Sequence, residues 1–327
     1  MNNKTINLTI GDIRNNWQLS EVKTLFDFSF NDLLFYAHSI HRKHFNQNEV
    51  QISTLLSIKT GGCAENCKYC PQSAHYDTEV KKENFMDKDE ILKKAKCAKD
   101  SGATRFCMGA AWRNLHDKDV DNICDIIKAV KETGLETCVT LGMLTKDQAK
   151  QLKSAGLDYY NHNIDSSREF YEQIVTTRTY DDRINTLKHV SDNDINVCCG
   201  GILGMGESRD DRINMLITLT NILDHPKSVP INLLEKVKGT PLEDVADFDV
   251  FEFIRTIAIA RIMLPESHIR LSAGRNNLSD EAQSLCFFAG ANSIFYGEKL
   301  LTQDNPTQNS DKILLEKLGI SAESTTN

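Results

Sequence analysis

The chain has 327 residues, 40% of them hydrophobic and 26% charged, so it can build one large core or two modest ones. Its formal net charge is −8, and no Lys/Arg cluster offers a basic face. We therefore expect no nucleic-acid partner. Residues 1–17 carry no signal-peptide pattern, and no run of about 18 apolar residues occurs, so we expect a cytoplasmic protein without a membrane partner. The ten cysteines are then expected as thiols or metal ligands.

The first predicted element is a helical region at Leu19–Phe45, which makes residues 1–45 an N-terminal helical extension. After it, short β-branched runs alternate with longer amphipathic stretches, a pattern typical of βα units around a parallel sheet. The predicted strands are Ile52–Ile58, Thr104–Met108, Glu136–Leu141, Tyr159–Ile164, Ile195–Ile202, Val229–Leu234, His268–Ser272 and Ser293–Tyr296. The predicted helices between and after them are Asp89–Ser101, Val120–Glu132, Lys146–Ala155, Asp181–Val190, Asp210–Leu223, Val250–Met263 and Ser279–Phe288.

Eight strands alternating with helices predict an α/β fold of the (β/α)8 TIM-barrel type over residues 46–303. A doubly wound open sheet is the alternative that the pattern leaves open. From Gln303 onward the chain turns polar, so residues 304–327 are expected to form a poorly ordered tail, apart from the short pattern Ile313–Leu318.

Three cysteines, Cys63, Cys67 and Cys70, follow the first predicted strand with the spacing C-x3-C-x2-C. Three thiolates can hold one metal centre and leave one coordination position open. Structural zinc sites and electron-carrying clusters normally use four protein ligands, whereas catalysis needs an open position. The loop therefore predicts a catalytic metal centre, with a zinc knuckle or purely structural thiols as the alternatives.

Three further cysteines, Cys107, Cys138 and Cys198, fall in the second, third and fifth predicted strands, and Arg270 falls in the seventh. Inward-facing barrel positions usually hold Val, Ile or Leu, so three thiols and a guanidinium would be an unusual lining. Barrel enzymes carry their chemistry at the C-terminal ends of the strands, so such a lining indicates a functional site. Cysteine also packs as a small hydrophobe, which is the alternative for each thiol taken alone. By strand alternation Cys199 must face the opposite way from Cys198. The structural interpretation applies to Cys97, Cys124 and Cys286, which lie in helical patterns.

Asn161, Asn163 and Asp165 alternate along the fourth predicted strand and so share one face. Inside a barrel they would need polar partners such as a bound ligand, whereas on a solvated edge they would need none. The glycines of Gly200–Glu207 do not satisfy G-x-G-x-x-G, so this segment does not predict a dinucleotide site.

A set of motifs in a fixed order allows a more specific prediction of the function. The motifs are Cys63–Cys70, Pro71–Ser73, Phe106–Asn114, Tyr159–Asp165, Gly200–Glu207, Val237–Pro241 and Arg270–Arg275. Over roughly residues 20 to 305, this set resembles the biotin synthase family of radical S-adenosylmethionine enzymes.

The resemblance implies two iron–sulfur clusters. A [4Fe–4S] cluster would be held by Cys63, Cys67 and Cys70, and a [2Fe–2S] cluster by Cys107, Cys138, Cys198 and Arg270. The implied contacts of S-adenosylmethionine are Gly109, Ala110, Asn163, Asp165, Arg183, Gly200, Ile202, Gly204 and Glu207. The implied contacts of dethiobiotin are Asn161, Asn163, Asn232 and Thr302. Amides suit its ureido ring, which offers N–H donors and a carbonyl acceptor.

The implied reaction is sulfur insertion between C6 and C9 of dethiobiotin, started by reductive cleavage of S-adenosylmethionine to a 5′-deoxyadenosyl radical, with sulfur taken from the [2Fe–2S] cluster. Side chains would supply ligation, positioning and exclusion of water, and none is expected to act as an acid or base. The implied partners are an electron donor of flavodoxin or ferredoxin type, the iron–sulfur assembly machinery and a second copy in a homodimer.

Two other functions remain as alternatives. Another radical S-adenosylmethionine enzyme, such as a lipoyl synthase or a hydrogenase maturase, shares the first loop, but a lipoyl synthase should carry an additional cysteine motif that is absent here. A non-enzymatic iron–sulfur carrier or sensor would need no nucleoside site. The chain departs from the family at Leu300–Gln303, where biotin synthases usually read Leu-Leu-Thr-Thr near the substrate carboxylate.

Overall fold

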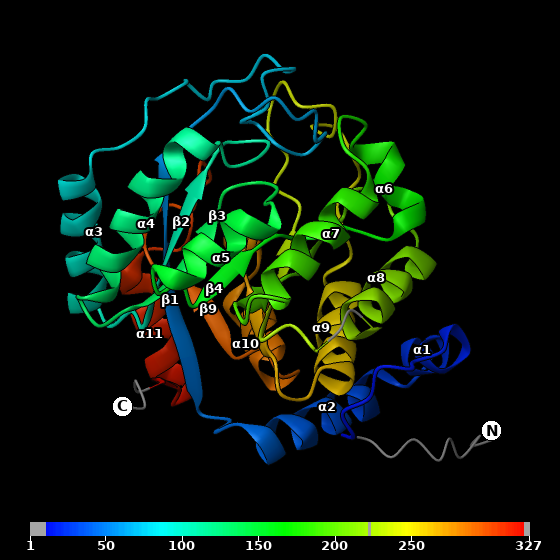
Figure 1. Cartoon of the computed structure of the whole chain (residues 1–327). Coiled ribbons are helices and arrows are strands. Elements are labelled where there is room, and N and C mark those ends of the chain that lie inside the picture. The colour runs from blue at the N-terminus through cyan, green and yellow to red at the C-terminus, as the bar shows by residue number, and fades with distance from the viewer. Residues whose placement is uncertain (1–10, 222–223, 324–327) are drawn as a thin grey trace.

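Parallel strands close into a barrel in the computed structural model, which describes residues 11–221 and 224–323 (Figure 1). The pairing order is β1-β2-β3-β4-β5-β7-β8-β9, and β9 pairs again with β1. The strands are β1 Glu49–Lys59, β2 Arg105–Ala110, β3 Glu136–Thr140, β4 Tyr159–Asn161, β5 Asn196–Cys198, β6 Gly201–Leu203, β7 Ser228–Leu233, β8 His268–Leu271 and β9 Ser293–Phe295. The predicted barrel is confirmed, and the open doubly wound sheet is not formed.

The fifth barrel position is built from two short strands. β5 and β6 both pair with β7. Between them, at Cys199 and Gly200, the strand conformation is interrupted. A Cβ atom on Gly200 would lie 1.9 Å from the carbonyl oxygen of Pro230, so only glycine fits where the chain passes β7. The sequence predicted one continuous strand here, because a break imposed by a neighbouring strand leaves no periodic signal.

The helices cover the outside of the barrel. They are α3 Lys88–Asp100, α4 Asp117–Lys131, α5 Lys146–Ser154, α6 Arg168–Ile174, α7 Tyr180–Ser191, α8 Arg209–Asn221, α9 Val250–Met263 and α10 Asp280–Phe288. All the predicted helices are present within a few residues, except that the last two residues predicted for α8, 222–223, lie outside the described residues. Helix α6 was not predicted, because its seven residues are too short for a periodic pattern.

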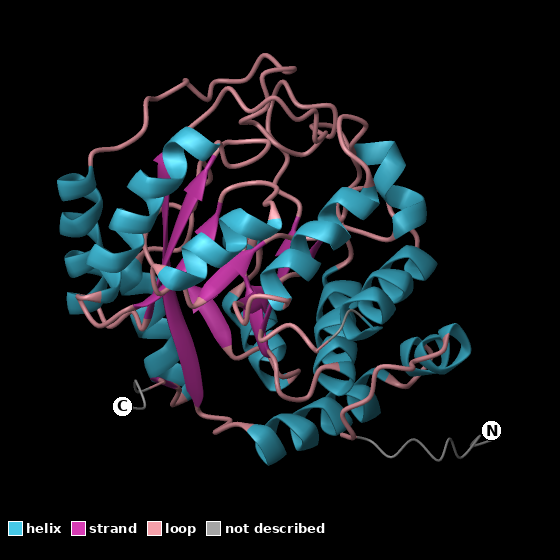
Figure 2. Cartoon of the chain, in the orientation of Figure 1, coloured by secondary structure: helices cyan, strands magenta, loops and turns pink. Residues whose placement is uncertain are grey.

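The N-terminal extension forms two helices, α1 Leu19–Phe26 and α2 Phe30–His44. They lie below the barrel in Figure 1, where α2 packs against α9 and α1 against α8 and α9. Figure 2 shows the long loops gathered at the other end, toward which the strands point. The C-terminal ends of the strands are where barrel enzymes place their sites, and the extension leaves that end free.

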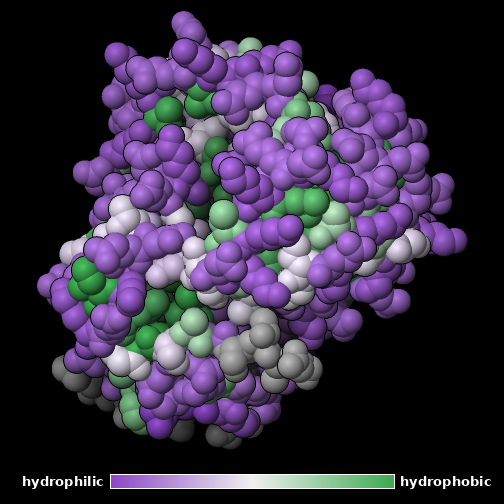
Figure 3. All heavy atoms as spheres, turned by 90° about the vertical axis from the view of Figure 1, so that its left-hand side faces the viewer, coloured by the Kyte–Doolittle hydropathy of each residue, from purple (hydrophilic) through white to green (hydrophobic). Residues whose placement is uncertain are grey.

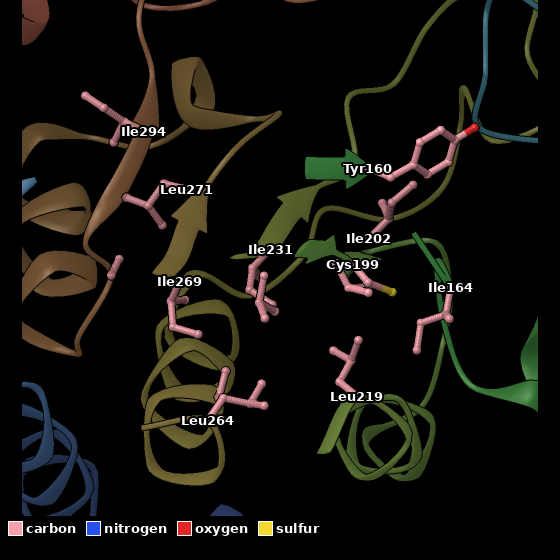
Figure 4. Packing of buried hydrophobic residues seen from close by; sticks show 14 of the residues in the cluster. Tyr160, Ile164, Cys199, Ile202, Leu219, Ile231, Leu264, Ile269, Leu271 and Ile294 are labelled. Atoms are coloured by element: carbon pink, nitrogen blue, oxygen red, sulfur yellow. The ribbon is translucent and has the colours of Figure 1, made fainter. Parts of the chain in front are cut away.

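A continuous apolar core fills the space between the strands and the helices. Figure 4 shows part of it, where Cys199 points toward Ile164 and Leu219 on the outer side of the barrel wall. Cys198 belongs instead to a separate buried cluster inside the barrel. The predicted opposite orientation of these two cysteines is thereby confirmed.

Regular secondary structure continues after β9. Helix α11, Gln308–Leu318, is longer than the short pattern predicted there, and β10, Ser321–Ala322, pairs with β1. Asp311 of α11 accepts two hydrogen bonds of 2.7 Å from the buried guanidinium of Arg275. This long-range pair anchors the helix, so the expectation of poor order does not describe residues 308–322. The domain bounds themselves stay a prediction, and residues 324–327 lie outside the described part.

The surface on the side of α3 is mostly hydrophilic, with apolar residues gathered in its hollows (Figure 3). Within residues 11–221 and 224–323, no helix is both long and apolar enough to span a membrane.

Candidate active site

The three-cysteine loop begins four residues after β1 and folds back on itself. The amide of Cys63 donates to the carbonyl of Gln72 (2.9 Å), and the amide of Ala74 donates to the carbonyl of Cys63 (2.7 Å). Across the site, the Asn66 side-chain amide donates to Thr176 Oγ1 (2.6 Å), which ties the loop to the segment after α6. Cys63 and Cys70 are partly buried and Cys67 is buried.

The surroundings of these thiols combine burial with a nearby cation. Burial raises the pKa of Cys63 and of Cys67, and it raises the pKa of Cys70 to about 12. The guanidinium of Arg178 lies with Nη2 3.9 Å from Cys67 Sγ. A bound metal would deprotonate such thiols, and Arg178 would compensate part of the resulting negative charge.

A second set of thiols lies inside the barrel. Cys107 of β2 and Cys138 of β3 are direct neighbours in the strand register. Cys198 of β5 is in register with Asn161 of β4 and with Ser228 of β7. All three thiols are buried. Cys138 makes side-chain hydrogen bonds with both Cys107 and Cys198, so the three thiols converge on one region inside the barrel.

Arg270 faces the same region from β8. Its Nε donates to Ser293 Oγ (2.8 Å), and its Nη2 donates to Gln51 Oε1 (3.0 Å) and to Ser53 Oγ (2.9 Å). Such a network fixes the orientation of a fully buried guanidinium. A hydrogen bond with Cys138, supported by the charge of Arg270, lowers the pKa of Cys198 to about 5. Cys198 is therefore favoured as a thiolate, the form that binds iron, whereas hydrogen bonds with Cys107 and Cys198 raise the pKa of Cys138.

One cavity of about 230 Å³ joins the two sets of thiols. It is lined by Cys70 from the loop and by Cys107, Cys138, Cys198 and Arg270 from the strands. Of the other predicted residues, the cavity wall includes Asn161, Asn163, Asp165, Ile202, Asn232 and Thr302. The structure thus brings together at one cavity residues that are more than two hundred positions apart in sequence.

The polar face of β4 and the turn after it borders this cavity. Asn161 Nδ2 lies 3.2 Å from Cys198 Sγ, and Asn163 Oδ1 accepts from the amide of Gly200 (3.1 Å). Asp165 has a φ of +66° and accepts hydrogen bonds from Tyr69 Oη (2.7 Å) and from Arg183. All three side chains border the cavity, although β4 ends at Asn161, so Asn163 and Asp165 lie beyond the strand that was predicted to reach Ile164. Tyr69 thereby ties the cysteine loop to the polar face.

Four residues that were predicted to contact S-adenosylmethionine make their contacts with other parts of the protein instead. Arg183 donates from Nη1 to the carbonyl of Asn163 (2.6 Å), from Nε to Tyr171 Oη (2.9 Å), and from Nη2 to Asp165. Glu207 accepts from the amides of Gly204 (3.0 Å) and Met205 (2.8 Å). Gly204, with φ +91°, and Gly200 are explained by close approach of the chain to itself. None of these four lines the cavity.

The loop after β9 covers the barrel mouth. A Cβ atom on Gly109 would lie 2.5 Å from Leu301 Cδ2, so Gly109, which precedes Ala110 at the end of β2, makes room for this loop. Asn232 holds the opposite wall, because its Nδ2 donates to the carbonyl of Gly201 (2.9 Å) and its Oδ1 accepts from the amide of Ala273 (3.1 Å). The loop and Asn232 therefore frame the cavity from two sides.

The structure also shows residues that the sequence interpretation missed. The fully buried Arg105 stacks on Tyr159 (3.4 Å to the ring centroid) and pairs with Glu136 below the inner thiols. Arg178 beside Cys67 and Glu235 at the cavity wall were not singled out either. The strand position of Arg105, two residues before Cys107, was the one available signal, because residues i and i+2 share a face.

The donor sets can be tested against the groups that the resemblance implied. Within the described residues, no three His, Cys, Asp or Glu side chains converge closely enough to hold a single metal ion. A cluster spreads its protein ligands over several iron atoms, one ligand per iron in [4Fe–4S] and two per iron in [2Fe–2S], and so accepts a wider spacing. Three thiols on one short loop, and three thiols with an arginine around one cavity inside the barrel, fit two clusters in their donor chemistry.

Known protein families match the regions of the chain that form the cavity. The family model of the Radical SAM superfamily matches residues 57–219, and that of the Biotin and Thiamin Synthesis associated domain matches residues 230–321. A biotin synthase of Alteromonas mediterranea is 61% identical, with 96% of this chain and 84% of that protein covered. The chain belongs to the biotin synthase family. A biotin synthase of Vibrio cholerae is 59% identical over 95% of this chain and 89% of that protein.

Solved structures agree on the fold alone. The crystal structure of a methylornithine synthase has a TM-score of 0.80 and 18% identity, with 94% of each chain covered. The hydrogenase maturase of Carboxydothermus hydrogenoformans has a TM-score of 0.80 and 17% identity, over 95% of this chain and 77% of that chain. Membership of the biotin synthase family does not favour the alternatives of a maturase-like enzyme or an iron–sulfur carrier.

Proposed function

We propose that this protein is an enzyme that converts dethiobiotin to biotin by S-adenosylmethionine-dependent sulfur insertion between C6 and C9. The observation that carries the proposal is the single cavity between the three-cysteine loop and the inner thiols, in a chain 61% identical to a biotin synthase. A reaction that needs two metal centres and one substrate requires such a shared space.

The proposal assigns two clusters to the two donor sets. Cys63, Cys67 and Cys70 would hold a [4Fe–4S] cluster, and Cys107, Cys138, Cys198 and Arg270 would hold a [2Fe–2S] cluster. When bound, the first cluster supplies the electron that cleaves S-adenosylmethionine and the second supplies the sulfur atom. The protein's own contribution is to hold both donor sets rigidly and to exclude water from the space between them.

The proposed contacts of S-adenosylmethionine divide into two kinds. Asn163, Asp165 and Ile202 line the cavity and are proposed to contact the nucleoside. The other proposed residues are Gly109, Ala110, Arg183, Gly200, Gly204 and Glu207. Arg183 is proposed to act mainly by orienting Asp165, since its guanidinium is already committed within the protein. Gly204 and Glu207 are proposed to shape the backbone beneath the nucleoside.

The proposed substrate contacts surround the ureido ring. Asn161, Asn163 and Asn232 lie on the cavity wall, and amides can both donate to the ring carbonyl and accept from the ring N–H groups. Thr302, on the loop after β9, is proposed to contact the acyl chain. The bonds that Asn161 makes to Thr140 (3.2 Å) and Cys198 keep its side chain oriented before the substrate binds.

Further features of the proposal rest on family membership. Reduction needs a one-electron donor, which we propose to be of flavodoxin or ferredoxin type, and cluster loading needs the iron–sulfur assembly machinery. We also propose a cytoplasmic location and a homodimer. Sedimentation of the purified protein would test the homodimer.

Single alanine variants of Cys63, Cys67 and Cys70 test the assignment. Each is expected to lose the [4Fe–4S] absorption and to form no 5′-deoxyadenosine, because two thiolates do not retain the cluster. Cys97→Ala, on the exposed face of α3, is the matched control and should behave like the parent. Parent-like 5′-deoxyadenosine formation in any of the three loop variants would contradict the proposal.

A further inference from the structure

The cavity between the two cysteine sets has two chemically different ends. Its inner end is formed by Cys107, Cys138, Cys198 and Arg270 inside the barrel. Its mouth lies beyond the strand ends, where the lining includes Glu235, which follows β7, and the loop residues Thr302 and Gln303. Glu235 is half-buried and lines the cavity wall.

The orientation of the substrate follows from the proposed function, on which this inference rests. The two carbons of dethiobiotin that receive sulfur adjoin its ureido ring, so the ring must lie near the inner thiols and the amides of Asn161 and Asn232. The alkyl chain with the carboxylate then extends away from the inner end. It reaches the mouth, where Glu235 lies.

The described residues that line the mouth include no cation to receive that carboxylate. Among the described residues that line the cavity, the charged side chains are Asp165, Glu235 and Arg270. Arg270 is committed to its own network, and Asp165 is committed to Arg183 and Tyr69. The charge that the acyl end meets is therefore that of Glu235.

The carboxyl group of Glu235 is poorly compensated. It accepts one hydrogen bond, from the amide of Gly274 (3.1 Å), and within residues 11–221 and 224–323 it forms no ion pair. Burial raises the pKa of Glu235, and the nearby Asp304 acts in the same direction. A second anion brought next to this carboxylate would be repelled, because partial burial weakens screening by water.

We propose that Glu235 is a specificity residue that disfavours an ionised carboxylate at the acyl end of the substrate. The cavity consequently binds a dethiobiotin derivative with an uncharged acyl end, such as an amide or an ester, more tightly than the free acid. Glu235 acts on the acyl end and lies outside both cysteine sets, so it does not enter the chemistry at C6 and C9.

Equilibrium binding tests this preference directly. Dethiobiotin and its primary amide are titrated anaerobically into the cluster-loaded protein with S-adenosylmethionine, at about pH 8, where the Glu235 carboxyl is expected to be ionised. The parent is expected to bind the amide roughly fivefold more tightly than the acid, as two like charges several ångströms apart would produce. Glu235→Gln keeps the shape and the acceptor for Gly274.

In Glu235→Gln the acid should bind roughly fivefold more tightly than in the parent, while affinity for the amide stays unchanged. The matched control, Glu298→Gln, alters an exposed glutamate outside the cavity wall and should keep the parent's ratio. An equal ratio in the parent and in Glu235→Gln, or a parent that prefers the acid, overturns the proposal. If neither ligand binds to any of the three proteins, the proposed function itself fails, and the inference fails with it.

Discussion

At the scale of single residues, the adjacent Cys198 and Cys199 give a sharp contrast, because one faces the cavity and the other faces the outer core. Cys198→Ala is expected to remove the [2Fe–2S] absorption and biotin formation, while cleavage of S-adenosylmethionine persists. Cys199→Ala should keep both clusters, with a loss of stability of about 1 kcal/mol for the small volume removed. Absorption spectra and iron content of the two variants decide it. The reverse pattern would show that the opposite face carries the cluster.

Arg270 is an unusual metal ligand, because a guanidinium holds its proton far above neutral pH. Its hydrogen bonds to Ser293, Gln51 and Ser53 indicate that placement and charge are its main contribution. Arg270→Lys and Arg270→Met are therefore expected to keep a reconstitutable [2Fe–2S] cluster and part of the biotin-forming activity. Loss of that absorption in both variants, with the [4Fe–4S] cluster intact, would show that ligation by arginine is essential.

The sequence was informative where chemistry is local and silent where partners are distant. The spacing of Cys63, Cys67 and Cys70 is readable because one loop carries all three. The commitment of Arg183 to Asp165 is not readable, since it depends on how α7, which packs against β5, approaches the turn after β4. Glu235 gave no signal at all, because only closure of the loop after β9 makes its position a cavity wall.

At the scale of elements, the strand and helix alternation was predictable because buried parallel strands and amphipathic helices have different periods. The break between β5 and β6 was not, since it arises from the approach of Gly200 to Pro230 of a later strand. Helix α11 was underestimated for a similar reason. Its anchor is the ion pair between Asp311 and Arg275, which no local pattern shows.

The packing of α2 against α9 buries a histidine, His41, with neither ring nitrogen hydrogen-bonded. Burial lowers its pKa from 6.5 to about 3, and the charges of Arg261 from α9, His38 from α2 and His268 from β8 act in the same direction. The unfolded chain therefore takes up this proton at a higher pH than the folded protein does. Stability is fully present above the unfolded pKa and is lost as the pH falls.

His41→Phe removes this titration while keeping a ring in the interface. Below about pH 6.5, the parent's free energy of unfolding should fall by up to about 1.4 kcal/mol per pH unit more steeply than that of His41→Phe. Urea unfolding between about pH 5 and pH 7 measures both slopes. The control His116→Gln, an exposed residue before α4, should follow the parent. Equal slopes for the parent and His41→Phe would show that His41 is not protonated on unfolding.

At the scale of the whole molecule, the barrel brings together two donor sets that are far apart in the chain. Cys70 precedes β2, whereas Arg270 lies in β8, yet both line one cavity. Closure of β9 onto β1 creates that shared space. Alternation of strands and helices predicted the barrel, but the cavity itself depends on the loop at Leu300–Gln303, whose path over Gly109 the sequence does not reveal.

The most direct test of the account is a product analysis of the anaerobically reconstituted protein, supplied with a reductant, S-adenosylmethionine and dethiobiotin. Biotin, methionine and 5′-deoxyadenosine are expected to appear together, and omission of dethiobiotin is expected to abolish the biotin. Methionine and 5′-deoxyadenosine without biotin, from protein that carries both clusters, would contradict sulfur insertion into dethiobiotin as the activity of this protein.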